Sequence, residues 1–236
     1  MELERPMTAL DKTYIVLCVL FSAFLITCTL TYKKIVYLPI LSFHTFTLSV
    51  AVVICPLMFM LTDLIAEFYD KKKASFCVKV AIAVNIFVAL MVSGMDALEA
   101  TPWSTVDNTK FHSVFGSYGL AFMACLLACY MAQLVDISVY LYLKKLTNGR
   151  WLWLRNNGST AISMLVDTFI AVGLLTMMGI YPKEHMLMVM MNAYSYKLFF
   201  TVCNIPFFYL LVGIMRRFIL DKKLVKTQMK LQSNMA

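Results

Sequence analysis

Charged residues are scarce in this chain of 236 residues. They make up 14% of the sequence, whereas 61% of the residues are hydrophobic. A soluble domain has roughly 25% charged and about 45–50% apolar residues. This deficit of charge excludes a soluble globular protein, and the length leaves little room for a soluble domain beside a membrane bundle. The composition therefore predicts an all-α, polytopic membrane protein.

Motifs for enzymatic chemistry are also missing. The sequence has no glycine-rich phosphate-binding loop, so the chain is not expected to hydrolyse nucleotides. Its three histidines lack the spacing of metal ligands, and no histidine neighbours Ser159 or Ser163. The seven cysteines all fall in apolar segments without metal-type spacing, which is typical of free, buried thiols. We predict a protein that is not an enzyme and that has neither a metal nor a cofactor.

Six apolar segments approach or exceed the length of about 20 residues that a membrane helix needs. They span residues 13–31, 46–68, 77–98, 114–143, 160–180 and 186–215. The shorter apolar stretch 35–42 contains Pro39 and is expected to lead into the second span as a re-entrant or interfacial segment. We predict a single six-helix transmembrane domain over residues 1–215. A basic cytoplasmic tail, residues 216–236, should lie on the membrane surface.

Basic residues give the chain a net charge of +8. They lie in short loops and in the tail, so they indicate a lipid bilayer rather than nucleic acid as the partner. If both termini share one side of the membrane, that side has 15 lysines and arginines and the other side has four. The positive-inside rule then places both termini in the cytoplasm.

Polar side chains within the predicted spans are the candidates for function, because a charge at the bilayer centre costs about 2.5–3.5 kcal/mol. Two acids of the second span are four residues apart, and an amide and an acid of the fourth are three apart, so each pair shares a helix face. Structural roles are the alternatives. Glu67, near the cytoplasmic boundary, could be structural, and a buried Asp–Lys pair could hold the bundle together. The amides of Asn85 and Gln133 could form hydrogen bonds between helices. The candidate substrate-binding residues are Asp63, Glu67, Asn85, Gln133, Asp136, Asp167 and Lys197.

Residues 149–160 (GRWLWLRNNGST) combine two tryptophans, two arginines and an Asn-Asn-Gly turn signal. The tryptophans suit the membrane interface, and Arg150 and Arg155 are expected to face the cytoplasm or lipid phosphates. Asn157 or Ser159 would cap the first turn of the fifth helix. The pattern predicts a cytoplasmic loop that fixes the start of the fifth span.

Two segments carry a resemblance to a known family. One is residues 61–69 (LTDLIAEFY), followed closely by three lysines, and the other joins residues 136–140 (DISVY) to residues 149–160 and to Asp167-Thr168. Both resemble signatures of the putative vitamin uptake transporter family, whose best understood members are queuosine-precursor transporters. The resemblance spans the six-helix body. Asp70 departs from it, since many members have glycine there, and Met164 stands where glutamine is common.

The resemblance implies a secondary transporter in the bacterial cytoplasmic (inner) membrane. It would import a nucleobase-like small molecule, a 7-deazaguanine (preQ0 or preQ1) or queuine, for salvage into modified tRNA. A fold similar to the substrate-binding components of energy-coupling-factor transporters is also implied. Two alternatives remain: a capture subunit that needs a separate ATPase module, and a membrane structural protein or enzyme without transport. The oligomeric state is open, with a homodimer as one alternative.

Overall fold

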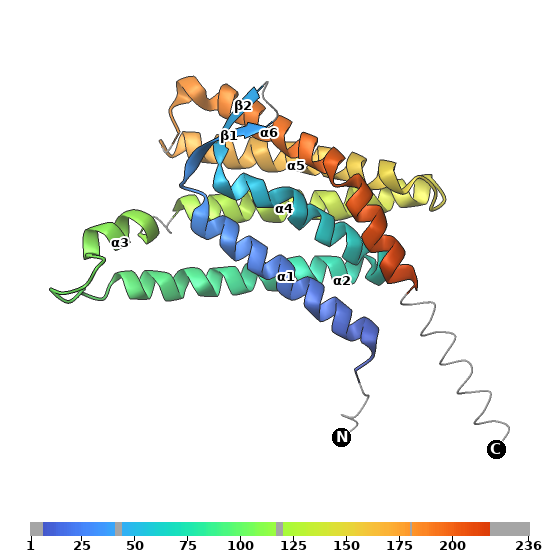
Figure 1. The fold of residues 1–236 in the computed structure, drawn as a ribbon, viewed down its shortest axis with the longest axis horizontal. Coiled ribbons are helices and arrows are strands. Elements are labelled where there is room, and N and C mark those ends of the chain that lie inside the picture. The colour runs from blue at the N-terminus through green and yellow to red at the C-terminus, as the bar shows by residue number, and fades with distance from the viewer. Residues whose placement is uncertain (1–6, 41–43, 117–119, 180, 218–236) are drawn as a thin grey trace, which may run out of the picture.

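Helices make up nearly all of the chain in the computed structural model, which describes residues 7–40, 44–116, 120–179 and 181–217 (Figure 1). Among the described residues, five helices are long and apolar enough to cross a membrane, which confirms the prediction of an all-α polytopic membrane protein. The one exception to the helical pattern is a two-stranded hairpin. In chain order the elements are α1 (Ala9–Thr31), β1 (Ile35–Ile40), β2 (His44–Ser49), α2 (Val50–Asp96), α3 (Asn108–Phe115), α4 (Leu120–Leu146), α5 (Leu152–Met177), the short 3-10 helix η1 (Lys183–His185) and α6 (Met186–Cys203).

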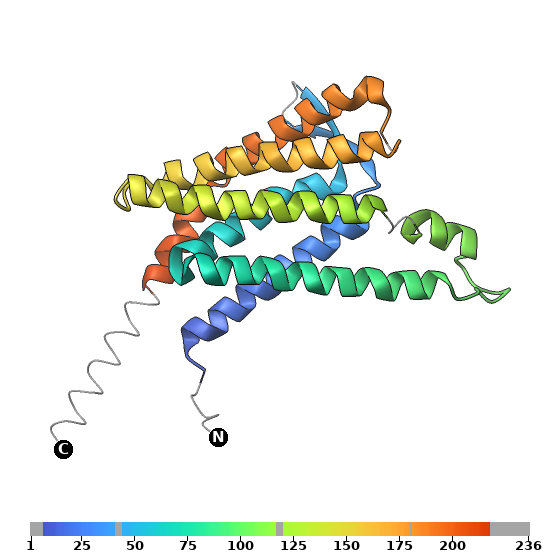
Figure 2. The same cartoon turned by 180° about the vertical axis from the view of Figure 1, so that it is seen from behind.

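Helix α2 consists of two helical halves that meet at Asp70, and the chain reverses its direction there (Figures 1 and 2). The backbone of Asp70 has φ 78° and ψ 163°, a conformation that residues other than glycine rarely adopt. Its carboxylate accepts a hydrogen bond from the backbone N–H of Lys71 at 2.6 Å. The second half is helical from Lys71, six residues before the predicted start of the third span.

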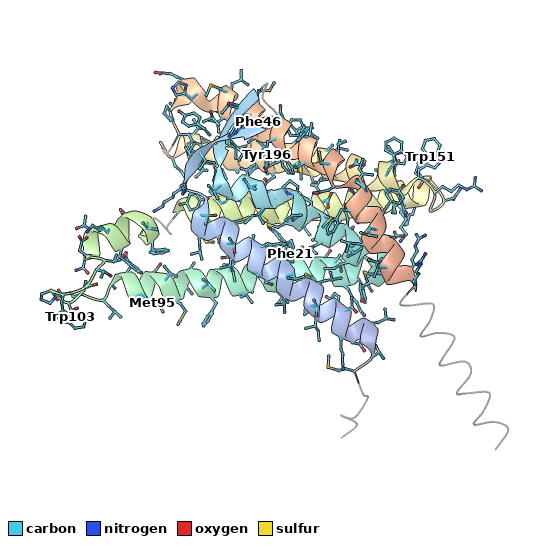
Figure 3. The ribbon with its side chains drawn as sticks, viewed as in Figure 1. Phe21, Phe46, Met95, Trp103, Trp151 and Tyr196 are labelled. Carbon is cyan, nitrogen blue, oxygen red and sulfur yellow. The ribbon has the colours of Figure 1, made fainter. Side chains whose placement is uncertain are left out.

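The turns of the bundle gather at two ends (Figure 1). The basic end holds the start of α1, the reversal at Asp70, the α4–α5 turn and residue 217. The hairpin end holds β1, β2, α3 and η1. Trp151 lies at the basic end and Trp103 at the opposite, outermost end (Figure 3). Both indoles are exposed, as expected of tryptophans near a membrane surface.

Residues 35–40 and 44–49 pair as two antiparallel strands, in the stretch predicted to lead into the second span as a re-entrant or interfacial segment. Ile35 pairs with Ser49 and Ile40 with His44. The strands occupy the start of the predicted second span, so α2 begins at Val50 instead of residue 46. Ser49 ends the strand and caps the helix, because its hydroxyl accepts a hydrogen bond from the N–H of Ala51 at 3.3 Å.

The fifth helix begins at Leu152, eight residues earlier than predicted, so most of residues 149–160 is helix rather than loop. The turn before it uses left-handed backbone at Asn148, Gly149 and Trp151. Trp151 occupies the N-cap position without a side-chain hydrogen bond, so the predicted capping by Asn157 or Ser159 is wrong. Tertiary contacts to α4 stabilise the early turns, and these contacts override the local turn signal.

Arg155 is buried, with 1% of its surface exposed, so the expectation that it faces the cytoplasm or lipid is also wrong. Gly158, which the sequence marks as a turn former, instead lies where α5 packs on α4. A Cβ atom there would lie 3.1 Å from the Cδ1 atom of Leu143. The glycine therefore allows close approach of the two helices, a common use of small residues in membrane bundles.

The predicted fourth and sixth spans are each divided. Residues 108–115 form the separate helix α3, and the spanning helix α4 starts only at Leu120. Helix α6 ends at Cys203, a turn follows at Asn204, and residues 205–217 are again helical. Pro206 accounts for this break, because proline removes a backbone donor and kinks a helix. Of the predicted tail, residues 216–236, only Arg216 and Arg217 are described, and both continue the helix; residues 218–236 lie outside the described residues.

Candidate substrate site

A cavity lies between the first half of α2 and helices α1, α4, α5 and α6. Leu48 and Ser49 of the hairpin and Tyr181 before η1 contribute to its wall, which places it towards the hairpin end. Burial raises the pKa of the Tyr181 hydroxyl, so this group stays a neutral hydrogen-bonding partner. The cavity volume that is available to the centres of water molecules is about 130 Å³. On this measure one water needs about 10–15 Å³, so the cavity is roughly ten times larger than a site for a single water. A small planar molecule is of this scale.

An ion pair between α5 and α6 supplies charge in the otherwise apolar wall. The ammonium of Lys197 lies 2.6 Å from the Asp167 carboxylate and donates to the Thr168 hydroxyl at 3.0 Å. All three residues line the cavity. Lys197 is 3% exposed, and its charge is compensated by the carboxylate as burial requires. The pair thus offers a ligand both an anionic acceptor and a cationic donor.

Gln133 of α4 adds an amide to the same cavity. Its Oε1 accepts a hydrogen bond from the Thr62 hydroxyl at 2.9 Å. Its Nε2 has no hydrogen-bond partner among the described residues, although the residue is fully buried. Leaving a buried donor unpaired costs about 1–3 kcal/mol. A carbonyl oxygen on a bound ligand would satisfy this donor.

Two further acids, Asp63 of α2 and Asp136 of α4, are buried but do not line the cavity. Thr160 donates to Asp63 Oδ2 at 3.4 Å, and Ser163 donates to Asp136 Oδ1 at 3.0 Å. Both hydroxyls belong to α5, so three helices meet at this pair. Thr160 and Ser163 are three residues apart on α5 and are themselves hydrogen-bonded, so the two carboxyl groups that they contact lie close to each other. Neither acid has a salt bridge to a described cation.

Glu67 sits in a cluster of cations at the basic end. Its carboxylate lies 2.8 Å from the Lys144 ammonium and 3.3 Å from the guanidinium groups of both Arg155 and Arg216. The Tyr140 hydroxyl donates to it at 3.1 Å. These contacts join α2 to α4, to α5 and to the helical residues 205–217, which closes the bundle at this end.

Asn85, on the second half of α2, faces α1 instead of the cavity. Its Oδ1 accepts a hydrogen bond from the Thr29 hydroxyl at 3.0 Å. This contact favours the alternative of an amide that joins two helices, whose hydroxyl–amide bonds are worth about 1–2 kcal/mol in model peptides.

The seven candidate residues thus occupy three levels. Gln133, Asp167 and Lys197 line the cavity, Asp63 and Asp136 lie beside it, and Glu67 lies at the basic end. Asn85 lies apart from these levels, on the second half of α2 against α1. Their role in binding a substrate stays a prediction.

Sequence reasoning missed several groups that line the cavity. Thr168 follows Asp167 directly and could have been found, because its hydroxyl is adjacent to a buried acid. Ser49 and Tyr181 lie outside the predicted bundle interior, so no helical pattern indicates them. Four of the cysteines also line the cavity: Cys28, Cys55, Cys125 and Cys129. All seven cysteines are free, as predicted, but the prediction that they are buried holds only for Cys28 and Cys77, and Cys203 is exposed.

Comparison with known proteins places these features in a class. Residues 49–211, more than half of the chain, match the family described as putative vitamin uptake transporter. The chain belongs to this family of multi-pass membrane proteins, whose members are transporters rather than enzymes. All seven candidate residues lie within the matched segment.

One relative has a more specific name. The chain is 29% identical over 153 residues to the probable queuosine precursor transporter of Bacillus subtilis (strain 168). The match covers 64% of this chain and 66% of the relative. No solved structure matches the chain.

Proposed function

We propose that this protein is a secondary transporter that imports queuosine precursors across the bacterial cytoplasmic membrane. Membership of the family and the name of the Bacillus relative support this substrate class. The observation that carries the proposal is a cavity whose few polar groups, an Asp–Lys pair and an unpaired amide donor, are gathered from α4, α5 and α6.

The proposed topology has six spans, with both termini in the cytoplasm. The reversal at Asp70 divides α2 into two crossings, which adds one to the five long apolar helices. Both the start of α1 and residue 217 lie at the basic end (Figure 1). This end also holds Lys71, Lys144 and Arg150, as the positive-inside rule requires of the cytoplasmic side. The cavity then lies towards the outer face.

A 7-deazaguanine has a carbonyl oxygen and neighbouring N–H groups on one edge of a flat ring. The Asp167 carboxylate can accept the N–H groups, and the Nε2 of Gln133 or the ammonium of Lys197 can donate to the carbonyl. Phe59, which also lines the cavity, offers a ring face for stacking. Sites that use buried hydrogen-bonding groups reject analogues that leave them unpaired, by factors as large as about 10⁴–10⁵.

The proposal is tested in cells that can neither synthesise queuosine precursors nor import them by another route. Expression of this chain should restore queuosine in tRNA when preQ0, preQ1 or queuine is supplied, and Asp167→Asn should lower the rate of restoration at least tenfold. The matched control is Glu184→Gln, which replaces an exposed acid of η1 and should behave as wild type. Absence of restoration by the wild-type chain with all three precursors would refute the proposal.

Uptake by the purified chain in liposomes separates a secondary transporter from a capture subunit. A secondary transporter moves labelled precursor without another protein. A capture subunit would bind precursor but move it only when an ATPase module is added.

A further inference from the structure

A column of polar side chains extends from the cavity to the basic end. On α2, Phe59, Asp63 and Glu67 recur every four residues, so they lie on one helix face about 6 Å apart. On α5, Ser163 and Asp167 have the same spacing. Helices α4 and α5 run side by side along this column (Figures 1 and 2). The Asp63–Asp136 pair lies midway, between the cavity and the Glu67 cluster.

The acids of this column have different partners. Glu67 contacts three cations and Asp167 contacts Lys197. Among the described residues, Asp63 and Asp136 accept hydrogen bonds from hydroxyl groups alone, and the donors Thr160 and Ser163, three residues apart on α5, place the two carboxyl groups close to each other. Asp63 Oδ1 and Asp136 Oδ2 have no hydroxyl, amide or cationic donor among the described residues. Two adjacent carboxylates without a cation repel each other strongly in a buried site, so a proton must lie between them.

No charged or titratable group described around the Asp63–Asp136 pair is free to compensate its negative charge in place of this proton. Glu67 is one turn away on α2, and its charge is compensated by its own cations. From α4, Tyr140 donates to Glu67, and from α5 the Arg155 guanidinium lies 5.6 Å from the Tyr140 ring and also serves Glu67. On the cavity side, the charge of Lys197 is compensated by its ion pair with Asp167.

We propose that the Asp63–Asp136 pair is the proton-binding site that couples inward movement of substrate to a proton gradient. This inference rests on the proposed transport function. In the conformation described here the pair holds one proton among α2, α4 and α5. When these helices separate towards the cytoplasm, water reaches the pair, the proton leaves to that water, and two hydrated carboxylates remain. Rebinding of a proton from the outer side restores the closed contact.

The purified chain in liposomes, with tritiated preQ1 as the probe, tests this coupling. An acidic exterior should drive accumulation of preQ1 at least tenfold above that seen without a pH gradient, and the lumen should acidify as preQ1 enters. Asp63→Asn and Asp136→Asn replace the shared proton with an amide donor to the remaining carboxylate. These variants should lose gradient-driven accumulation. They should still exchange external label for internal unlabelled preQ1, because neither acid lines the cavity, and loss of this exchange would assign the acids to substrate binding and overturn the proton role. Glu184→Gln should retain both activities.

A second measurement does not depend on transport. The infrared spectrum of the purified protein at neutral pH should contain the carbonyl band of a protonated carboxylic acid, and this band should disappear in Asp63→Asn and in Asp136→Asn. Three further results would overturn the proposal. They are absence of the band in the wild type, wild-type accumulation that does not depend on the pH gradient, and gradient-driven accumulation in both variants. Loss of preQ1 exchange in the wild type with the band retained would count against the proposed substrate and not against the proton site.

Discussion

Three acidic sites inside one bundle illustrate how neighbours decide the role of an identical chemical group. The Glu67 carboxylate is held by cations and joins helices at the basic end. The Asp167 carboxylate has one cation and lines the cavity. Among the described residues, Asp63 and Asp136 have hydroxyl donors and no cation, and they lie close to each other. These differences suit closure, substrate binding and proton binding respectively.

The Asp167–Lys197 pair should show strong energetic coupling. Lys197→Met leaves the Asp167 carboxylate buried without a cation, and breaking a buried pair in this way costs about 3–5 kcal/mol. The double variant Asp167→Leu/Lys197→Met removes both charges and should recover much of that loss. Unfolding titrations in mixed micelles measure the free energies for a double-mutant cycle.

The exposed pair of Asp107 and Lys110 at the start of α3 provides the control. Its side chains are 56% and 69% exposed, so Lys110→Met should leave stability nearly unchanged. Equal effects of Lys197→Met and Lys110→Met would contradict the assignment of a buried, coupled pair.

At the scale of elements, the contact between α4 and α5 brings the polar groups of the column into register. The α4–α5 turn ends at Trp151, and Gly158 then allows α5 to approach Leu143 of α4 closely. This approach sets Ser163 beside Asp136. The packing of one small residue therefore affects the geometry of the carboxyl pair one to two turns away.

Gly158→Val should destabilise the bundle, because the added atoms would press on Leu143 and overpacking typically costs about 1–3 kcal/mol. The same measurement on Gly173→Ala, in the same helix, should show a gain of about 0.5–1 kcal/mol. A Cβ at Gly173 meets nothing within 4 Å, and alanine favours a helix more than glycine does. Thermal unfolding in detergent reports both changes, and similar effects at the two glycines would argue against close packing at Gly158.

At the scale of the whole molecule, the reversal at Asp70 determines which loops share a side of the membrane. With two crossings in α2, the connection after Asp96 faces outwards and the α4–α5 turn faces the cytoplasm. With one crossing, both assignments would be exchanged, because every later helix would start from the opposite side.

Reporter fusions distinguish these topologies. Alkaline phosphatase, which is active only outside the cytoplasm, should be active when fused after Glu99 and inactive when fused after Asn148. A fluorescent protein that folds only in the cytoplasm should give the opposite pattern at these two positions. The reverse result for both reporters would show that α2 crosses the membrane once.

Composition and apolar run lengths alone determined the class of protein, since a bilayer demands long apolar helices whatever their packing. Short motifs around Asp63, Asp136 and Asp167 indicated the family, and the cost of a buried charge marked the polar residues as candidates. The predictions of class and family hold because they depend on each segment's own chemistry and on the solvent around it, whereas the binding role of the candidates stays a prediction.

Only the tertiary structure decided which of those candidates line the cavity, which lie beside it and which join helices elsewhere. Nothing near Arg155 in sequence predicts its contact with Glu67, 88 residues away, and local signals at Asn157 and Gly158 favour a turn where contacts with α4 maintain a helix. Strand pairing, which local apolarity does not specify, joins residues 35–40 to residues 44–49. The partner of each acid is set by packing between distant helices, and that partner determines whether the group joins helices at the basic end, lines the cavity or belongs to the carboxyl pair beside it.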